Sequence, residues 1–187
     1  MKIVGFGASS MQGAGDPEGG FFKRVSSFFE SAGSHFEFVN LGVGGDTTIQ
    51  MLERLPRVTK EKPEMTIVLL GCNDMPRVPD ASPLNRTSLE QYKTNLSTIL
   101  STIQAKRSLF ISSFEVDPIK TGISLELFQN YMDGARELAE NLGYEIWDLL
   151  SETRAQKAEF LATDGVHYNG LGHAYIAGKL ISKLQDG

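Results

Sequence analysis

Apolar runs and amphipathic segments alternate along this 187-residue chain. Five short apolar runs have the length of buried β-strands; they are residues 2–6, 36–39, 65–70, 109–112 and 144–147. After each run, apolar residues recur three and four positions apart, which predicts helices; these are residues 21–32, 47–57, 89–103, 125–142, 151–160 and 169–184. The alternation predicts one α/β domain over residues 1–187, with an approximately five-stranded parallel sheet, helices on both faces and right-handed crossovers.

Polar residues mark the starts of three of these helices. Thr47 or Asp46 precedes the helix that runs through Arg57, and either side chain suits a helix N-terminus. Thr87 and Glu90 have the spacing of a capping box. Asn169 is predicted to cap the last helix, whose inward face we expect to carry four apolar residues, namely Leu171, Ile176, Leu180 and Leu184.

Composition and charge narrow the class of protein. Hydrophobic residues make up 41% of the chain and charged residues 22%, as in ordinary soluble proteins. The net charge of -5, without a basic cluster, argues against a nucleic-acid partner and against attachment to acidic membranes. No apolar run is long enough to cross a bilayer, and because Met1 leads directly into a predicted strand, we expect no signal peptide. Because Cys72 is the single cysteine, no internal disulfide is possible, and we expect a cytoplasmic protein.

Small and polar residues follow three predicted strands and recur in one late loop. They are Gly7-Ala8-Ser9, Gly45, Asn73, and Asp164 with His167. Since the carboxyl ends of parallel strands meet at one edge of a sheet, the first three groups are expected to lie together. Each group alone also fits an ordinary turn, because serine, glycine, asparagine and aspartate are the common turn residues.

Together these groups match a family pattern. The blocks are residues 6–9 (F-G-A-S) with Gly13, residues 40–47 (N-L-G-V-G-G-D-T), residues 71–74 (G-C-N-D) and residues 164–167 (D-G-V-H). In this order they resemble the SGNH (GDSL-like) hydrolases over nearly the whole chain. The resemblance implies a flavodoxin-like three-layer sandwich and a serine esterase without a cofactor. Ala8 departs from the pattern, since the family commonly has aspartate before the serine.

The resemblance also assigns roles to residues of this chain. It implies Ser9 as nucleophile, His167 as base and Asp164 as the acid that orients His167. It further implies an oxyanion hole formed by the backbone of Ser9, the backbone of Gly45 and the side chain of Asn73. The spacing suits this chemistry, because three residues of chain can bring the Asp164 carboxylate to one imidazole nitrogen and leave the other for the serine.

The remaining histidines and the cysteine have simpler interpretations. His35 lacks an acid partner in the sequence, and His173, in the first turn of the last helix, is predicted to be exposed. Three scattered histidines give no metal-ligand spacing, so no metal is predicted. Cys72 is interpreted as a small buried residue rather than a rival nucleophile.

We therefore predict an enzyme acting on a small-molecule ester with a short acyl group, possible substrates including O-acetyl groups on sugars. The loops expected to border the site, 13–20, 75–85 and 114–122, contain no amphipathic lid helix that would cover a long acyl chain. A thioesterase or lysophospholipase-like enzyme is the alternative. A carbohydrate- or dinucleotide-binding domain without catalysis is the alternative of another class, although Ser10 stands where G-x-G-x-x-G requires its third glycine. We make no prediction of oligomeric state.

Overall fold

Five parallel strands form one sheet in the order β2-β1-β3-β4-β5. The computed structural model describes residues 1–78 and 87–186 of the chain. The strands are β1 (Lys2–Gly7), β2 (Glu37–Gly42), β3 (Met65–Leu69), β4 (Arg107–Ile111) and β5 (Glu145–Trp147). All five lie where the apolar runs predicted them. β2 continues to Gly42, three residues beyond its predicted end, because Asn40–Gly42 pair with residues 5–7 of β1.

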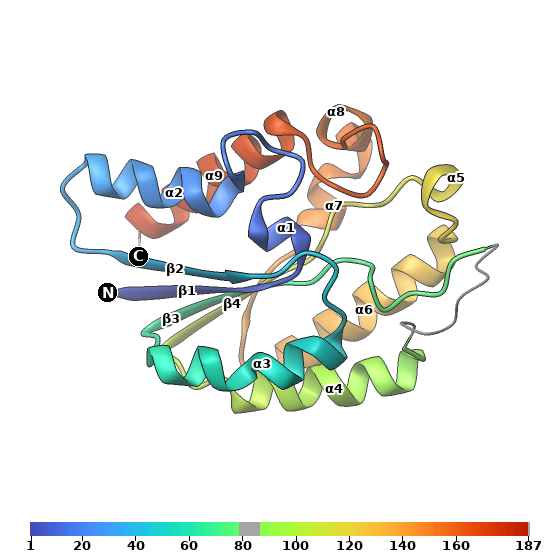
Figure 1. Cartoon of the computed structure of the whole chain (residues 1–187), viewed down its shortest axis with the longest axis horizontal. Coiled ribbons are helices and arrows are strands. Elements are labelled where there is room, and N and C mark those ends of the chain that lie inside the picture. The colour runs from blue at the N-terminus through green and yellow to red at the C-terminus, as the bar shows by residue number, and fades with distance from the viewer. Residues whose placement is uncertain (79–86, 187) are drawn as a thin grey trace.

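Helices cover both faces of this sheet (Figure 1). On one face lie α3 (Thr48–Glu61), α4 (Leu89–Thr102) and α6 (Leu125–Asn141). On the other face α2 (Gly20–Ser31) packs against α9 (Gly170–Gln185). The three layers confirm the predicted α/β sandwich.

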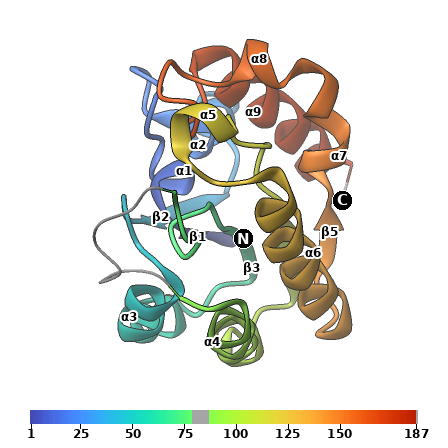
Figure 2. The same cartoon turned by 90° about the vertical axis from the view of Figure 1, so that its right-hand side faces the viewer.

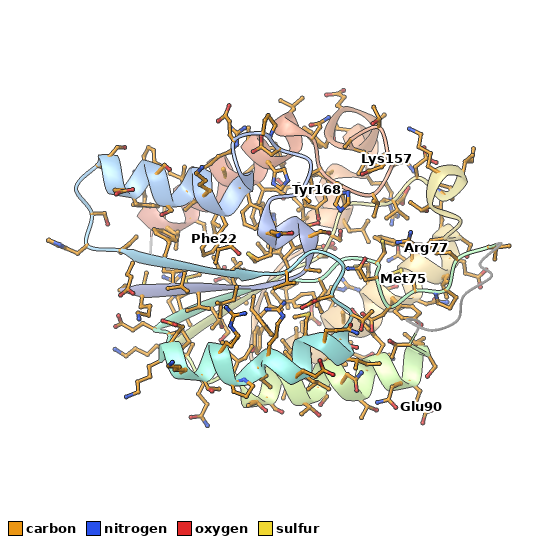
Figure 3. The ribbon with its side chains drawn as sticks, in the orientation of Figure 1. Phe22, Met75, Arg77, Glu90, Lys157 and Tyr168 are labelled. Carbon is orange, nitrogen blue, oxygen red and sulfur yellow. The ribbon has the colours of Figure 1, made fainter. Side chains whose placement is uncertain are left out.

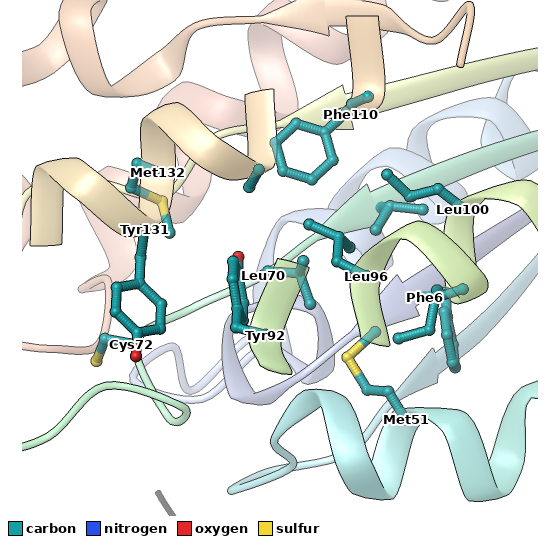
Figure 4. Close-up of a cluster of buried hydrophobic side chains, with 14 of the residues drawn as sticks. Phe6, Met51, Leu70, Cys72, Tyr92, Leu96, Leu100, Phe110, Tyr131 and Met132 are labelled. Carbon is teal, nitrogen blue, oxygen red and sulfur yellow. The ribbon is translucent and has the colours of Figure 1, made fainter. Parts of the chain in front are cut away.

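Successive strand residues point to opposite faces, so the sheet separates two apolar cores. The core against α3, α4 and α6 receives Val4 and Phe6 from β1, Val68 from β3 and Phe110 from β4; part of it is drawn in Figure 4. The opposite core receives Ile3, Ile67, Leu109 and Ile111. All five residues of β3 are buried, which explains its continuous apolar sequence, because a central parallel strand is covered on both faces.

Short helices fill the connections near the carboxyl ends of the strands. They are α1 (Ser9–Gln12), α5 (Pro118–Thr121), α7 (Leu149–Thr153), η2 (Arg154–Gln156) and α8 (Lys157–Phe160). The single helix predicted at 151–160 is therefore wrong. The first helix of this region, α7, starts before the predicted position because Asp148 is its N-cap. The Asp148 side chain accepts the N–H of Ser151 at 3.1 Å. The segment predicted as loop 114–122 contains α5, which is capped by the side chain of Asp117. The predicted loop 75–85 is described only as far as Val78, and the rest lies outside the described residues.

The helix starts were predicted with mixed success. Thr47, one of the two predicted caps, is the N-cap of α3, and it forms a capping box with Gln50 that was not predicted. The helix continues past its predicted end at Arg57 to Glu61, because Val58 is also buried in the core. At α4 the prediction of Thr87 is wrong. Ser88 is the N-cap, and its hydroxyl accepts the N–H of Gln91 at 3.2 Å.

The last helix begins at its predicted cap, where the Asn169 side chain accepts the N–H of Gly172 at 2.9 Å. Ile176, Leu180 and Leu184 are buried as predicted, whereas Leu171 is 56% exposed. The inward face of α9 is formed by His173, Ile176, Ala177, Leu180 and Leu184 at helical spacing, and Leu171 lies off this face. No helix within residues 1–78 and 87–186 has the length and apolarity needed to cross a membrane.

Candidate active site

The predicted site residues lie at the carboxyl edge of the sheet, onto which Figure 2 looks. β1 is the neighbour of both β2 and β3. Ser9 follows β1 and starts α1, Gly45 lies three residues after β2, and Asn73 lies four residues after β3. The topology therefore brings the three strand-end groups to neighbouring positions, as expected for a parallel sheet.

The turn that carries Ser9 is held by the backbone. The Ala8 carbonyl accepts the N–H of Gln12 at 3.0 Å, and the Ser9 carbonyl accepts that of Gly13 at 3.0 Å. Ala8, which replaces the usual aspartate, is buried at 3% exposure and needs no side-chain bond for this turn. Ser9 is partly exposed whereas Ser10 is only 5% exposed, so a substrate can reach Ser9 but not Ser10.

Asp164 and His167 form a hydrogen-bonded pair. One carboxylate oxygen lies 2.7 Å from His167 Nδ1. The other accepts the backbone N–H groups of Val166 at 2.9 Å and His167 at 3.0 Å. Partial burial opposes ionisation of Asp164, but these hydrogen bonds outweigh it and lower the pKa of the carboxyl to about 2. Asp164 is therefore a carboxylate at neutral pH.

Backbone hydrogen bonds close the loop that carries this pair. Ala162 donates to the His167 carbonyl at 2.8 Å, and Asn169 donates to the Phe160 carbonyl at 2.8 Å. From outside the loop, Asp117 donates to the Gly165 carbonyl at 2.8 Å. The loop is thus fixed at its base and along one side, which limits the movement of His167.

Contacts of Tyr168 bring the His167 loop to the Ser9 turn. Tyr168 is fully buried, and its hydroxyl lies 2.9 Å from the Ser113 hydroxyl. Burial raises the pKa of Tyr168, and the nearby Ser10 side chain opposes this effect. Figure 3 shows Tyr168 beside α1. Because Ser10 and Tyr168 directly follow Ser9 and His167, this proximity places the candidate nucleophile and base in neighbouring segments.

Gly15 adds a second contact between these segments. A Cβ at this position would lie 2.1 Å from the Tyr168 carbonyl oxygen, and its φ is +92°, so only glycine fits without strain. Its loop is held by Asp16, whose carboxylate binds Arg24 at 2.8 and 3.0 Å. The Arg24 guanidinium lowers the pKa of Asp16 to about 2, so this ion pair persists at neutral pH.

His173 is buried, so the prediction that it is exposed is wrong. Its Nδ1 accepts the N–H of Phe21 at 3.0 Å, and its Nε2 lies 3.0 Å from the Ala14 carbonyl oxygen. Burial lowers the pKa of His173, which favours the neutral ring that these two bonds require. It is a structural histidine that anchors the loop containing Gly15.

Asn73 and Gly45, the two predicted oxyanion donors outside the Ser9 turn, meet at Asp46. Asn73 Nδ2 donates to the Asp46 carbonyl at 2.9 Å, which orients the carboxamide. Gly45 is exposed and has a φ of +83°, a conformation that glycine adopts without strain. This hydrogen bond joins the segment after β2 to the segment after β3.

Two polar networks behind these donors were not predicted from the sequence. Asp74 is buried and binds the start of α3, accepting the Thr48 N–H at 3.0 Å and the Thr48 hydroxyl at 2.6 Å, and burial raises its pKa. Arg54 forms an ion pair with Asp46. Asp74 is 26 residues from Thr48, and Arg54 is 8 residues from Asp46 and 47 from Gly7. Helical and strand periodicity therefore gives no signal for either network.

The side chains that could bind a metal ion are dispersed in the described part of the chain. Within residues 1–78 and 87–186, no cluster of three or more His, Cys, Asp or Glu side chains is arranged to hold a metal ion. Cys72 is buried and reduced, in agreement with its interpretation as a core residue.

Comparison with known proteins identifies the family. The model of the GDSL-like Lipase/Acylhydrolase family matches residues 6–175. The GDSL esterase/lipase CPRD49 of Arabidopsis thaliana is 26% identical over 206 residues, which cover 99% of this chain and 79% of the plant protein.

Two solved structures share the fold. The lipase/acylhydrolase from Enterococcus faecalis has a TM-score of 0.83 at 23% identity, covering 99% of this chain and 95% of its own. The acetylxylan esterase Axe2 from Geobacillus stearothermophilus has a TM-score of 0.80 at 19% identity, covering 97% and 92%. The chain therefore belongs to the GDSL-like lipase/acylhydrolase family, and it is a hydrolase of ester bonds.

Proposed function

We propose that this hydrolase cleaves small carboxylic esters through an acyl-enzyme on Ser9. The observation that carries the proposal is the Asp164–His167 pair at 2.7 Å, set in a loop that packs at Tyr168 against Gly15, shortly after the Ser9 turn. Serine is a weak nucleophile at neutral pH and needs such an oriented base beside it. Ser9, partly exposed at the start of α1, is the hydroxyl that a substrate can reach.

The reaction proceeds in two halves. Because Asp164 engages Nδ1 of His167, Nε2 accepts the Ser9 proton while Oγ attacks the ester carbonyl. The backbone N–H groups of Ser9 and Gly45 and the amide of Asn73 stabilise the oxyanion of the tetrahedral intermediate. His167 then returns the proton to the leaving alcohol, which leaves the acyl group on Ser9. Water, deprotonated by His167, releases the carboxylic acid and restores the hydroxyl of Ser9.

The surroundings of the pair favour a short acyl group and a polar alcohol. The side chains of His167 and Asp164 are 30% and 47% exposed, so the reaction centre lies at the surface rather than in a deep apolar tunnel. Beside the loop that carries the pair, a cavity of about 440 Å³ has a mixed lining. Its polar residues are Asp117, Lys120, Lys157 and Thr163, and its apolar ones are Pro118, Ala158, Leu161 and Ala162; Figure 3 labels Lys157. The polar residues of this lining suit a leaving alcohol that carries several hydroxyl groups. Similar structures described as acetylxylan esterases support an acetyl ester of a sugar.

Hydrolysis of p-nitrophenyl acetate tests the proposal. The unmodified protein should release p-nitrophenol above the rate in buffer and should be labelled by a fluorophosphonate. NADH fluorescence should not change on titration with the protein. If the protein did not hydrolyse the ester but bound NADH or a xylan oligosaccharide, this result would contradict the proposal. It would favour the alternative of a binding domain without catalysis.

Acyl-chain length provides a second measurement. We expect kcat/KM to be highest for p-nitrophenyl acetate or butyrate and to fall for octanoate and palmitate. Each added methylene contributes about 0.8 kcal/mol of binding only where apolar surface buries it, and the exposed pair offers little. A steady rise through octanoate would contradict this expectation and favour the thioesterase or lysophospholipase-like alternative.

Replacing Asn73 with alanine should lower kcat on the order of a hundred- to a thousand-fold, as loss of one oxyanion donor does in a well-studied protease. Asn40→Ala is the matched control, because Asn40 also bonds the backbone through its side chain, at the Met11 carbonyl and the Gly42 N–H. Turnover and melting temperature are measured for both variants. If Asn73→Ala lost activity only in proportion to folded protein, Asn73 would be structural.

A further inference from the structure

Arg54 of α3 is a charged residue with a nearly buried side chain, 12% exposed. Its guanidinium bonds three different segments of the chain. Nη2 donates to the Gly7 carbonyl at 2.7 Å, Nη1 donates to the Leu41 carbonyl, and Nε donates to the Asp46 carboxylate. The guanidinium also lies over the Phe6 ring, 4.6 Å from its centre. All of its polar contacts are thus at the carboxyl ends of β1 and β2.

These three segments lead to the proposed oxyanion donors. Gly7 is two residues before Ser9, and Asp46 directly follows Gly45. The Asp46 carbonyl accepts the bond that orients Asn73. One guanidinium therefore connects the supports of all three donors, although it does not belong to the donor set itself.

The chemistry of the contact requires arginine. Its planar fork presents five N–H donors in fixed directions, whereas lysine carries a point charge on a flexible stem. Nearly buried charges are stable only when paired, and the side chain of Asp46 is itself 10% exposed. On the far side of the same turn, Asp74 fixes the Thr48 N–H. The segment 45–48 is consequently held from two directions, and Arg54 supplies the contact to the Ser9 strand.

We propose that Arg54 is a positioning residue that sets the spacing of the oxyanion hole. This inference rests on the proposed function. Arg54 acts through Asp46 and Gly7, so its loss should let the Gly45–Asp46 turn drift from the end of β1 and misplace the Gly45 N–H and the Asn73 amide. The Asp164–His167 pair is not in contact with Arg54 and should keep its properties.

The test compares Arg54→Met with Arg54→Lys and with Arg57→Met, a matched control on the exposed face of the same helix. Arg54→Met should lower kcat on the order of ten- to a hundred-fold, less than direct loss of a donor. KM and the shape of the pH–rate profile should remain those of the unmodified protein. Arg54→Lys should recover part of the loss, and Arg57→Met should behave as the unmodified protein.

A double-mutant cycle with Asn73→Ala separates positioning from general destabilisation. If Arg54 acts through the oxyanion hole, Arg54→Met should cost several-fold less in the Asn73→Ala background than in the unmodified protein, because neighbours in one network are not additive. Full multiplication of the two losses, or a rise in KM with kcat unchanged, would overturn the proposal.

Amide hydrogen exchange gives a readout that does not depend on activity. Exchange of the hydrogen-bonded Asp46 and Thr47 amides should be at least tenfold faster in Arg54→Met than in Arg57→Met, and equal rates would overturn the positioning role. Lack of esterase activity in the unmodified protein would contradict the proposed function alone. The exchange measurement would still decide whether Arg54 holds this turn.

Discussion

Ser9→Ala should abolish ester hydrolysis, whereas Ser10→Ala should retain most of it. Removal of the nucleophile of a well-studied serine protease lowers kcat on the order of a million-fold, and the same loss is expected here if acylation occurs on Ser9. Ser10 is only 5% exposed, so its loss should affect stability more than turnover. The comparison needs kcat on p-nitrophenyl acetate and a melting temperature for each variant.

The site of covalent labelling provides the decisive control for this prediction. After reaction with a fluorophosphonate, mass spectrometry should locate the adduct on Ser9, and Ser9→Ala should not be labelled. An adduct on Ser10 or on the buried Cys72 would show that the nucleophile is misassigned. Loss of labelling in a Ser9→Ala protein that has also unfolded would be recognised from its melting curve.

Asp164→Asn should produce the second largest effect, a fall in kcat on the order of ten thousand-fold, as the equivalent change does in a serine protease. The substituted amide can hold the imidazole in the wrong tautomer and cannot stabilise its charged form. Folding should persist, because the remaining carbonyl oxygen can still accept the N–H groups of Val166 and His167. Asp117→Asn is the matched control, since Asp117 caps a short helix beside the same loop and bonds Gly165 through its backbone.

The pH dependence of this pair follows from the lowered pKa of Asp164. With a folded-state pKa of about 2 against an ordinary value of 3.8, the carboxylate is favoured by folding. Its contribution to stability is therefore complete above the ordinary value and is lost as the pH falls toward 2. The Asp164→Asn defect in kcat should accordingly be present throughout pH 5–8. A defect confined to the alkaline end of this range would contradict the role assigned to Asp164.

Much of the fold was predictable because burial leaves a pattern along the chain. A strand such as β3 shows its position by an unbroken apolar run, and a helix such as α6 by residues three and four apart. The strand-end groups were likewise visible, since a parallel sheet collects its carboxyl ends at one edge. The ends of elements were less predictable. Ser88 rather than Thr87 caps α4. β2 continues beyond its predicted end because residues 40–42 pair with β1.

Long-range polar contacts were the part that the sequence did not indicate. His173 is 152 residues from Phe21 and 159 from Ala14, yet it bonds both. Arg54 lies in an amphipathic helix, where a charged residue is normally exposed to solvent. Its side chain is instead only 12% exposed and bonds the carbonyls of Gly7 and Leu41 at the ends of β1 and β2. The packing of helices on the sheet determines which residues form such long-range contacts, and local periodicity carries no information about this packing.

The order of the site residues along the chain has a consequence for biosynthesis. The sheet is complete at Trp147, and Ser9, Gly45 and Asn73 all precede that residue. Asp164 and His167 come later, and His173, which anchors the loop beside Ser9, comes later still. Because synthesis releases the N-terminal part first, the proposed nucleophile and oxyanion donors reach the folding chain before their base. Hydrolysis therefore reports on folding through α9 rather than on formation of the sheet alone.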